Sequence, residues 1–226
     1  MKAFKVDLDS SENQNILKSS ACPFNKAHQV NEVPEKIAKK IYELIEGTKH
    51  SNDDIILNHN KIKEAFFSPF KPQLKNAQVF LSHSHTDKNK ALKVKNYLES
   101  KTNRRVFIDS LFWDYKDDVL NELAKYDDTS KIEDAFTLIL RESLQDMIEK
   151  CPYFVFLQSN NSVSNQGLSR ITYSAWIYEE LKIAHSIRES RPTPMMEDAK
   201  VSHNISPFLE DLEIITLKKL SQQINS

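Results

Sequence analysis

The chain has 226 residues, which is enough for one domain with its own core and an additional segment. Lysine and arginine number 31 against 32 aspartates and glutamates, so the formal charge of −1 gives no reason to expect nucleic acid or an anionic membrane surface as a partner. The first residues lack the apolar segment of a signal peptide, and no run approaches about 18 apolar residues, so we expect a soluble cytoplasmic protein.

The numbers and positions of glycine and cysteine residues exclude further classes of protein and of site. The two glycines, Gly47 and Gly167, are too few to form either G-x-G-x-x-G or G-x-x-x-x-G-K-[ST]. Those loops need glycine so that the backbone can approach a phosphate closely, which disfavours a conventional Rossmann dehydrogenase and a P-loop NTPase. Cys22 and Cys151 lie far apart in the sequence, and we expect free thiols there.

The first third of the chain, 1–76, is predicted to form an N-terminal arm and a helical extension. Residues 1–30 are polar without a sustained period, which indicates a flexible or loosely packed arm. A helix is predicted from Pro34 to Gly47, because apolar residues recur there at helical spacing. A second, weaker helix is predicted from about Asp53 to Phe67, followed by a proline-containing linker.

The remainder, 77–226, alternates short apolar runs with helical patterns. The predicted strands are 79–81, 106–108 and 153–157. The predicted helices are 89–100, 132–150 and 174–188. Continuous apolar runs are typical of strands buried on both faces, so we predict an α/β fold with a doubly wound parallel sheet. Beyond Arg188 we expect a loop, one or two further strands, one of them within 213–217, and a final helix.

Ligands of such sheets bind at the carboxyl ends of the strands, and the first predicted strand is followed there by His83, His85 and Asp87. This H-x-H-x-D pattern is typical of metal-dependent hydrolases. Lys88 then follows where a further ligand is needed, and the later histidines form no recognisable ligand pair. The pattern also fits a strand end in which Thr86 or Asp87 caps the next helix.

A third interpretation rests on a family resemblance. The sequence Phe80-Leu81-Ser82-His83-Ser84, with Asp87 three residues later, resembles the first box of bacterial TIR (Toll/interleukin-1 receptor-like) domains. Three further landmarks follow in the family's order: Val106–Asp109 as the second strand, with the variable loop from Ser110, Tyr153–Asn165 as the third strand and Ser-rich turn, and Ser174–His185 as the S-x-W-x-x-x-E-L box. The resemblance covers about Ala77 to Ile187 and implies a flavodoxin-like sheet.

The sequence departs from the family pattern in three places. The stretch from Leu111 to Lys131 is longer than a compact loop, and about ten residues are inserted between the Ser-rich turn and the Trp box. The fourth and fifth strands of the family fold are not evident.

Helical geometry distinguishes two adjacent carboxylates in the last box. At about 100° per residue, Ile177, Leu181 and Ala184 form a buried stripe. Glu179 projects almost opposite this stripe, whereas Glu180 lies at its margin, roughly 60–70° from the centre. Geometry alone leaves open that Glu180 is an ordinary boundary residue. The TIR resemblance implies that Glu180 is the catalytic glutamate.

The implied activity is that of an NAD glycohydrolase or cyclase that breaks the nicotinamide–ribose bond of NAD. A carboxylate can stabilise the oxocarbenium-like transition state of this reaction. Attack by water releases ADP-ribose, and attack by the adenine ring gives a cyclic product. NAD is the substrate and no cofactor is expected; the expected setting is prokaryotic antiviral defence or signalling.

Supporting roles are predicted for other residues. Ser82 and Ser84 are expected to contact the nucleotide or the sheet, Phe112 and Trp113 to stack on a ring or pack on the core, and Trp176 to shape the pocket. Asp109 is placed in the pocket or, like Asp87, as a structural cap. The two histidines of the first box are expected to be bystanders.

The alternative function is a non-catalytic TIR interaction or scaffold module. The resemblance implies self-association through the loop after the second strand, and active sites of the family are often completed by a neighbouring subunit. A downstream effector that reads a nucleotide signal is a possible further partner. The metallo-hydrolase that uses His83, His85 and Asp87 is the third candidate.

Overall fold

The computed structural model describes residues 1–19, 34–46, 58–70, 76–126, 130–166, 169–189 and 202–226. Two compact units are present, and each combines separate parts of the sequence. The first contains Met1–Phe24, Asn76–Asp109 and Gln145–Ser226, and the second contains Asn25–Lys75 and Ser110–Leu144. The units therefore interleave along the chain, whereas the sequence suggested a single division between residues 76 and 77.

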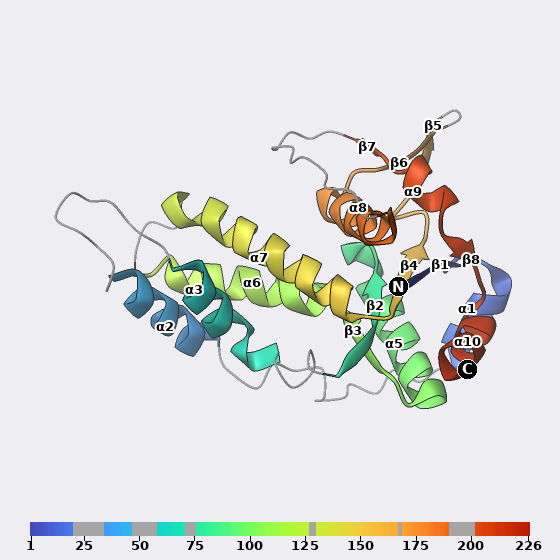
Figure 1. The fold of residues 1–226 in the computed structure, drawn as a ribbon, viewed down its shortest axis with the longest axis horizontal. Helices are drawn as coiled ribbons and strands as arrows, with labels where there is room; N and C mark the ends of the chain where they lie inside the picture. Colours follow the sequence, from blue (N-terminus) through green and yellow to red (C-terminus); the bar gives the residue numbers. More distant parts are fainter. Residues whose placement is uncertain (20–33, 47–57, 71–75, 127–129, 167–168, 190–201) are drawn as a thin grey trace. The chain divides into compact units, whose positions relative to one another are not determined.

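The first unit is an α/β structure with a five-stranded parallel sheet (Figure 1). In spatial order the strands are β3 (Arg105–Ile108), β2 (Ala77–Ser82), β4 (Tyr153–Gln158), β1 (Lys2–Asp7) and β8 (Glu213–Ile214). The three strands predicted from continuous apolar runs are confirmed as β2, β3 and β4. Their central residues are buried, as expected for strands covered on both faces. The expected strand within 213–217 is present as the short β8.

The position of β1 corrects the prediction of a loosely packed arm. Phe4 pairs with Val155 of β4 on one side and with Glu213 of β8 on the other, so β1 lies inside the sheet. Phe4 and Val6 are fully enclosed. The sequence hides this strand because Lys5, a residue type that is rarely buried, interrupts a short apolar run.

Helices cover both faces of this sheet (Figure 1). On one side lie α1 (Ser11–Ser19), α5 (Lys88–Thr102) and α10 (Leu217–Asn225); on the other lie α8 (Ala175–Glu189) and α9 (Ser206–Glu210). The buried side chain of Asn13, in α1, links this helix to α10 and to the strand β1. Its Oδ1 accepts a hydrogen bond from the Leu217 amide at 2.9 Å, and its Nδ2 donates to the Asp7 carbonyl at 2.7 Å. Residues 11–19 are therefore also part of the folded unit.

A small antiparallel sheet adjoins α8 and α9 in the sequence and was not predicted. It contains β5 (Ser164–Gln166), β6 (Ser169–Thr172) and β7 (His203–Asn204). The hairpin of β5 and β6 accounts for most of the insertion that precedes the Trp box.

The second unit is helical. It contains α2 (Pro34–Glu46), α3 (His59–Phe67) with the 3₁₀ turn η2 (Ser68–Phe70), α6 (Ser110–Leu123), and α7 (Ser130–Lys150) as far as Leu144. The helix predicted from Pro34 is confirmed. The segment expected to be a variable loop is instead α6, because Tyr115, Val119 and Leu123 recur every four residues and form one buried face. The start of the weaker predicted helix, 53–57, lies outside the described residues.

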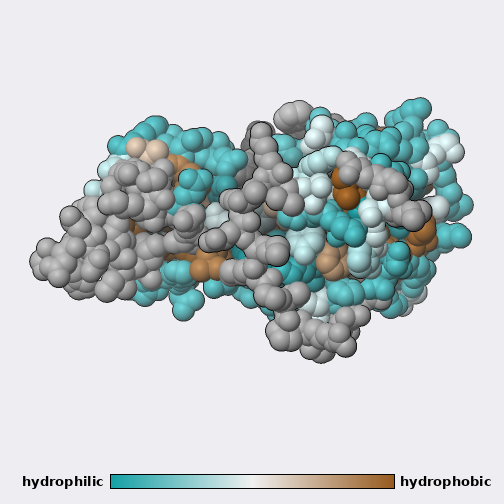
Figure 2. Space-filling model, turned by 90° about the horizontal axis from the view of Figure 1, so that it is seen from above, coloured by the Kyte–Doolittle hydropathy of each residue, from teal (hydrophilic) through white to brown (hydrophobic). Residues whose placement is uncertain are grey.

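Among the coloured residues of the face shown in Figure 2, most are hydrophilic, and apolar residues form small separate patches. Among the described residues, the large apolar side chains with substantial exposure are Tyr126, Tyr173 and Ile214. Within the described ranges, no helix has the length and apolar character needed to cross a membrane.

Candidate active site

Four polar side chains are buried together at the carboxyl ends of β2 and β3 and on α8. Their exposed fractions are 0% for Glu180 and Ser82, 3% for His83 and 4% for Asp109. Polar and charged residues are seldom buried to this extent without a structural or functional reason. This group, the Glu180 cluster, contains three residues that were predicted as site residues, Glu180, Ser82 and Asp109, and one, His83, that was expected to be a bystander.

The register of the sheet explains why residues distant in sequence meet here. Leu81 of β2 is paired with Ile108 of β3, so Ser82, the last residue of β2, lies beside Asp109, the first residue after β3. Both strands are parallel, and their carboxyl ends therefore reach the same edge.

Glu180 comes from the helix α8. The stripe of Ile177, Leu181 and Ala184 is buried as predicted. Glu180 is more deeply buried than its marginal position on the helical wheel suggested. Glu179 is half-buried, and its Oε1 lies 3.4 Å from the Lys182 Nζ. The neighbouring glutamates therefore occupy different environments, which makes Glu179 a matched control for Glu180.

The pKa of Glu180 lies well above its ordinary value. Burial is the main cause, because it disfavours the charged form, and the nearby Asp109 carboxylate raises the pKa further. The hydroxyl of Ser82 acts in the opposite direction. Among the described residues, neither Glu180 oxygen meets a donor with good hydrogen-bond geometry, although Asp109 and Ser82 lie close enough to influence its charge. The raised pKa favours the neutral form of Glu180, which lies beside a second carboxyl.

His83 is part of this cluster, which corrects the expectation that both histidines are bystanders. Its Nδ1 lies 2.9 Å from Asp109 Oδ1. Burial alone would lower the pKa of His83, but the Asp109 charge and hydrogen bond outweigh it, and the net pKa is raised. Asp109 therefore sits between an imidazole and a carboxyl.

Asp87 forms a second buried group at the carboxyl ends of β2 and β4. It accepts hydrogen bonds from the Ser159 hydroxyl and from Asn161 Nδ2, the latter at 2.9 Å, and Lys90 Nζ lies 3.2 Å away. Burial opposes ionisation, but these three partners prevail and lower the pKa of Asp87. Asp87 does occupy the N-cap position of α5, yet its side chain makes no capping hydrogen bond. The predicted capping role is therefore wrong.

The three residues of the H-x-H-x-D pattern have separate surroundings. His83 faces Asp109, Asp87 faces Ser159 and Asn161, and His85 is exposed in the 3₁₀ turn η3 (His85–Asp87). Within the described part of the chain, no group of three or more His, Cys, Asp or Glu side chains converges as metal ligands would. A shared metal would require these residues to leave their present partners.

The other predicted site residues do not join the Glu180 cluster in the described contacts. Ser84 is buried, and its hydroxyl lies 3.5 Å from the Thr86 hydroxyl, so it contacts the turn. Trp176 is half-buried on α8, one turn before Glu180. The backbone of Phe112 and Trp113 is part of α6, but the structure does not describe their side chains.

The cluster has the components for acid–base and electrostatic chemistry. Two carboxyls, a hydroxyl and an imidazole are held together with little exposure to solvent, where electrostatic interactions are strong. No protein-family model, curated protein or solved structure shows a significant match to this chain.

Proposed function

We propose that this chain is an NAD glycohydrolase or ADP-ribosyl cyclase and that Glu180 is its catalytic residue. The observation that carries the proposal is the placement of Glu180, fully buried beside Ser82 and Asp109 at the carboxyl ends of parallel strands. Carboxyls with strongly perturbed pKa values are concentrated at functional sites. Sequence resemblance and geometry select the same glutamate out of two neighbours by separate arguments.

The strand order supports a flavodoxin-like, TIR-like assignment. A flavodoxin-like sheet has the order 2-1-3-4-5. If β2, β3 and β4 are its first three strands, the observed order β3-β2-β4-β1-β8 matches it, with β1 in the fourth position and β8 in the fifth. The fourth strand that was not evident after β4 is then supplied by residues 2–7. This would be a rearranged version of the family topology.

The proposed reaction breaks the bond between the ribose C1′ and the nicotinamide nitrogen. The bonding electrons go to the nicotinamide ring, which leaves as a neutral molecule. Water then bonds to C1′ and loses a proton, so NAD and water give nicotinamide, ADP-ribose and a proton; attack by the adenine ring gives a cyclic product instead. The positive nicotinamide ring would favour the ionised form of Glu180, and the carboxylate would stabilise the oxocarbenium-like transition state.

Access to Glu180 requires a movement of the chain, because its exposed fraction is 0%. The proposal therefore describes an enzyme with a closed resting state that opens when triggered. Such control suits a cytoplasmic defence or signalling enzyme, since uncontrolled cleavage would deplete the cell's NAD.

The test compares the purified protein with Glu180→Gln and Glu179→Gln. Each is incubated with NAD over a range of protein concentrations, and nicotinamide release is followed by chromatography with mass spectrometry of the products. We expect Glu180→Gln to lose activity by about 10²–10³-fold, as when one transition-state-stabilising group is removed. Glu179→Gln should remain within a few-fold of the wild type. Activity of Glu180→Gln at the wild-type rate would overturn the assignment.

The second candidate is a non-catalytic interaction module. The enclosure of Glu180 favours it, because a buried neutral carboxyl with no exposed surface also fits a structural role. This candidate predicts association that depends on protein concentration, measurable by light scattering, with no nicotinamide release at any concentration. Self-association together with turnover would instead indicate an enzyme that works as an oligomer.

A further inference from the structure

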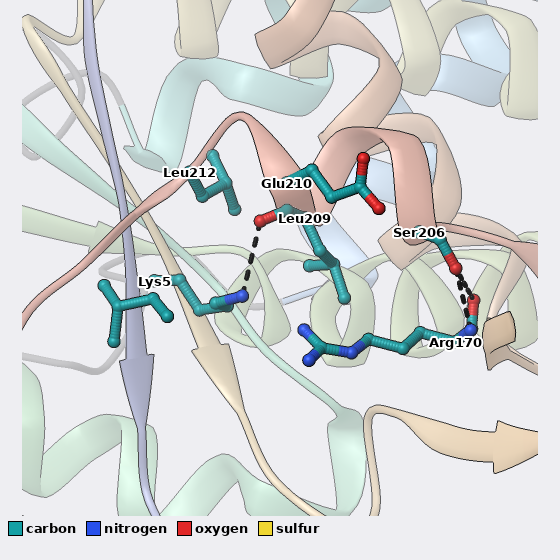
Figure 3. A pocket seen from close by; sticks show the side chains of 7 residues that line it. Lys5, Arg170, Ser206, Leu209, Glu210 and Leu212 are labelled. Atoms are coloured by element: carbon teal, nitrogen blue, oxygen red, sulfur yellow. Dashed lines mark hydrogen bonds between the residues drawn. The ribbon is translucent and has the colours of Figure 1, made fainter. Parts of the chain in front are cut away.

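A pocket of about 350 Å³ lies in the first unit, and none of its lining residues belongs to the Glu180 cluster. Two basic side chains, Lys5 of β1 and Arg170 of β6, line it together with one carboxylate, Glu210. The apolar part of its wall is formed by Leu209, Leu212 and Ile214. Figure 3 shows the ammonium group of Lys5 and the guanidinium group of Arg170 directed toward the same space.

Lys5 is an unusual residue for the interior of a sheet. Its exposed fraction is 5%, and lysines are almost never buried to this degree unless they are paired. Its Nζ donates one hydrogen bond, of 3.3 Å, to the Leu209 carbonyl near the end of α9. Lysine has three N–H donors, and no carboxylate among the described residues forms an ion pair with it. The contact with α9 therefore explains only part of its donor capacity.

Arg170 adds a second positive charge. Its backbone is fixed, because its amide donates to the Ser206 hydroxyl at 2.8 Å and its carbonyl accepts from the same hydroxyl at 3.5 Å. In Figure 3 the Glu210 carboxylate points away from both basic groups. Burial, and after it the charge of Arg170, lowers the pKa of Lys5. Two cations thus face one pocket without a neutralising group between them in the described structure.

We propose that this pocket binds a small molecule through a phosphate group held between Lys5 and Arg170. A phosphate dianion would neutralise both cations and accept hydrogen bonds from the fork of Arg170 and the remaining donors of Lys5. The apolar wall of Leu209, Leu212 and Ile214 would contact the organic part of the ligand. The site is therefore assigned to phosphomonoesters, and it stands independently of the activity proposed for Glu180.

The first experiment measures the thermal unfolding of the full chain with inorganic phosphate and with phenyl phosphate, using chloride at matched ionic strength as the control. A ligand that binds only the folded state raises the melting temperature by a few degrees at about ten times its Kd, and the rise then grows with the logarithm of the ligand concentration. We expect both phosphates to produce this rise, and phenyl phosphate to bind more tightly because it also contacts the apolar wall. A shift no larger than that with chloride would overturn the proposal.

Three variants localise the effect. Lys5→Met and Arg170→Gln should weaken phenyl phosphate binding at least tenfold, as measured by calorimetric titration. Glu210→Gln should bind as tightly as the wild type or more tightly, because it removes a negative charge from the pocket wall. If Lys5→Met does not fold, Arg170→Gln still provides the test. The side chain of Arg170 is exposed, and its replacement leaves the five-stranded sheet intact. Wild-type affinity in Arg170→Gln would exclude this pocket as the site.

Discussion

At the scale of the single residue, the buried carboxyl of Glu180 lowers the stability of the folded state at neutral pH. A carboxyl that is buried and protonated must lose its proton when the chain unfolds above the ordinary pKa of glutamate. The folded state therefore binds more protons than the unfolded state, and stability falls as the pH rises from the unfolded pKa toward the raised folded pKa. At neutral pH, stability alone would therefore favour an uncharged replacement at this position.

Glu180→Gln is therefore expected to be more stable than the wild type at pH 7–8 and similar to it near pH 4, where both side chains are neutral. A gain of 1 kcal/mol would appear as a rise of about 2–4 °C in melting temperature for a chain of this size. Calorimetric scans over this pH range measure the difference. Glu179→Gln, whose side chain is half-buried beside Lys182, is the matched control. A pH-independent difference would show that folding does not raise the pKa of Glu180.

The His83–Asp109 pair has the same direction of pH dependence for a different reason. The pKa of His83 is raised, so its protonated form stabilises the fold below the unfolded pKa of about 6.5, and this contribution is lost as the pH rises through the folded pKa. Because the pair is buried, replacing His83 leaves the buried Asp109 carboxyl without its imidazole partner. We expect His83→Leu to lower the free energy of unfolding by about 3–5 kcal/mol at pH 6 and by less at pH 9.

Denaturant titrations of His83→Leu and the wild type at the two pH values test this expectation. His85→Leu serves as the control, since His85 is exposed and a surface substitution should change stability by only about 0.5 kcal/mol. Equal losses at pH 6 and pH 9 would mean that the protonated imidazole contributes nothing.

At the scale of the element, β1 holds the sheet together between β4 and β8. Phe4 is 1% exposed, so truncating it leaves a cavity in the core. We expect Phe4→Ala to lower the free energy of unfolding by about 3–5 kcal/mol, whereas Lys2→Ala at the exposed start of the strand should change it by about 0.5 kcal/mol or less. Chemical denaturation measures both. Similar stabilities for the two variants would restore the view of residues 1–30 as a loosely packed arm.

The elements that could be predicted are those with strong local patterns. Strands β2, β3 and β4 are continuous apolar runs, and α2 and α8 have clear helical periods. The strand β1 was not predicted, because it is stabilised by pairing with distant residues such as Phe156, and no local sequence pattern indicates such pairing. The helix α6 was missed because the family resemblance favoured a loop over its own four-residue spacing.

The candidate site was predicted in part for similar reasons. Glu180 could be distinguished from Glu179 by helical geometry, and Ser82 and Asp109 by their positions at strand ends. His83 could not be placed, because sequence spacing does not show that its ring meets a carboxylate 26 residues away in the chain. The roles of Ser159 and Asn161 as partners of Asp87 depend on the adjacency of β2 and β4, which is again a tertiary property.

At the scale of the whole molecule, the chain forms two compact units. In the helical unit, Phe66 is fully buried, and its ring centre lies 5.3 Å from that of Phe67, 5.5 Å from that of Tyr115 and 5.8 Å from that of Phe136. We expect Phe66→Ala to destabilise this unit by about 3–5 kcal/mol. Hydrogen exchange should then speed up in α3 and α6, while the amides of β1, β2 and β4 keep their protection.

Loss of protection in the strands to the same extent would contradict this expectation and would show that the two units unfold as one. Val119→Ala removes buried volume from α6 and should reproduce the exchange pattern of Phe66→Ala with a smaller amplitude, since fewer atoms are lost.

The place of β1 in the sheet has a consequence for the newborn chain on the ribosome. Lys5 bonds to Leu209, a residue 204 positions later, and β8 follows only after it. At a synthesis rate of about 5–20 residues per second, roughly 10–40 seconds separate the emergence of these two segments. Until Tyr153–Gln158 have emerged β1 lacks its partner β4, and until the end of the interval it lacks β8, so one or both of its edges are unpaired and available to chaperones. The five-stranded sheet is thus completed late in translation, so an NAD-consuming activity built on it would be withheld from the cell until β8 has emerged.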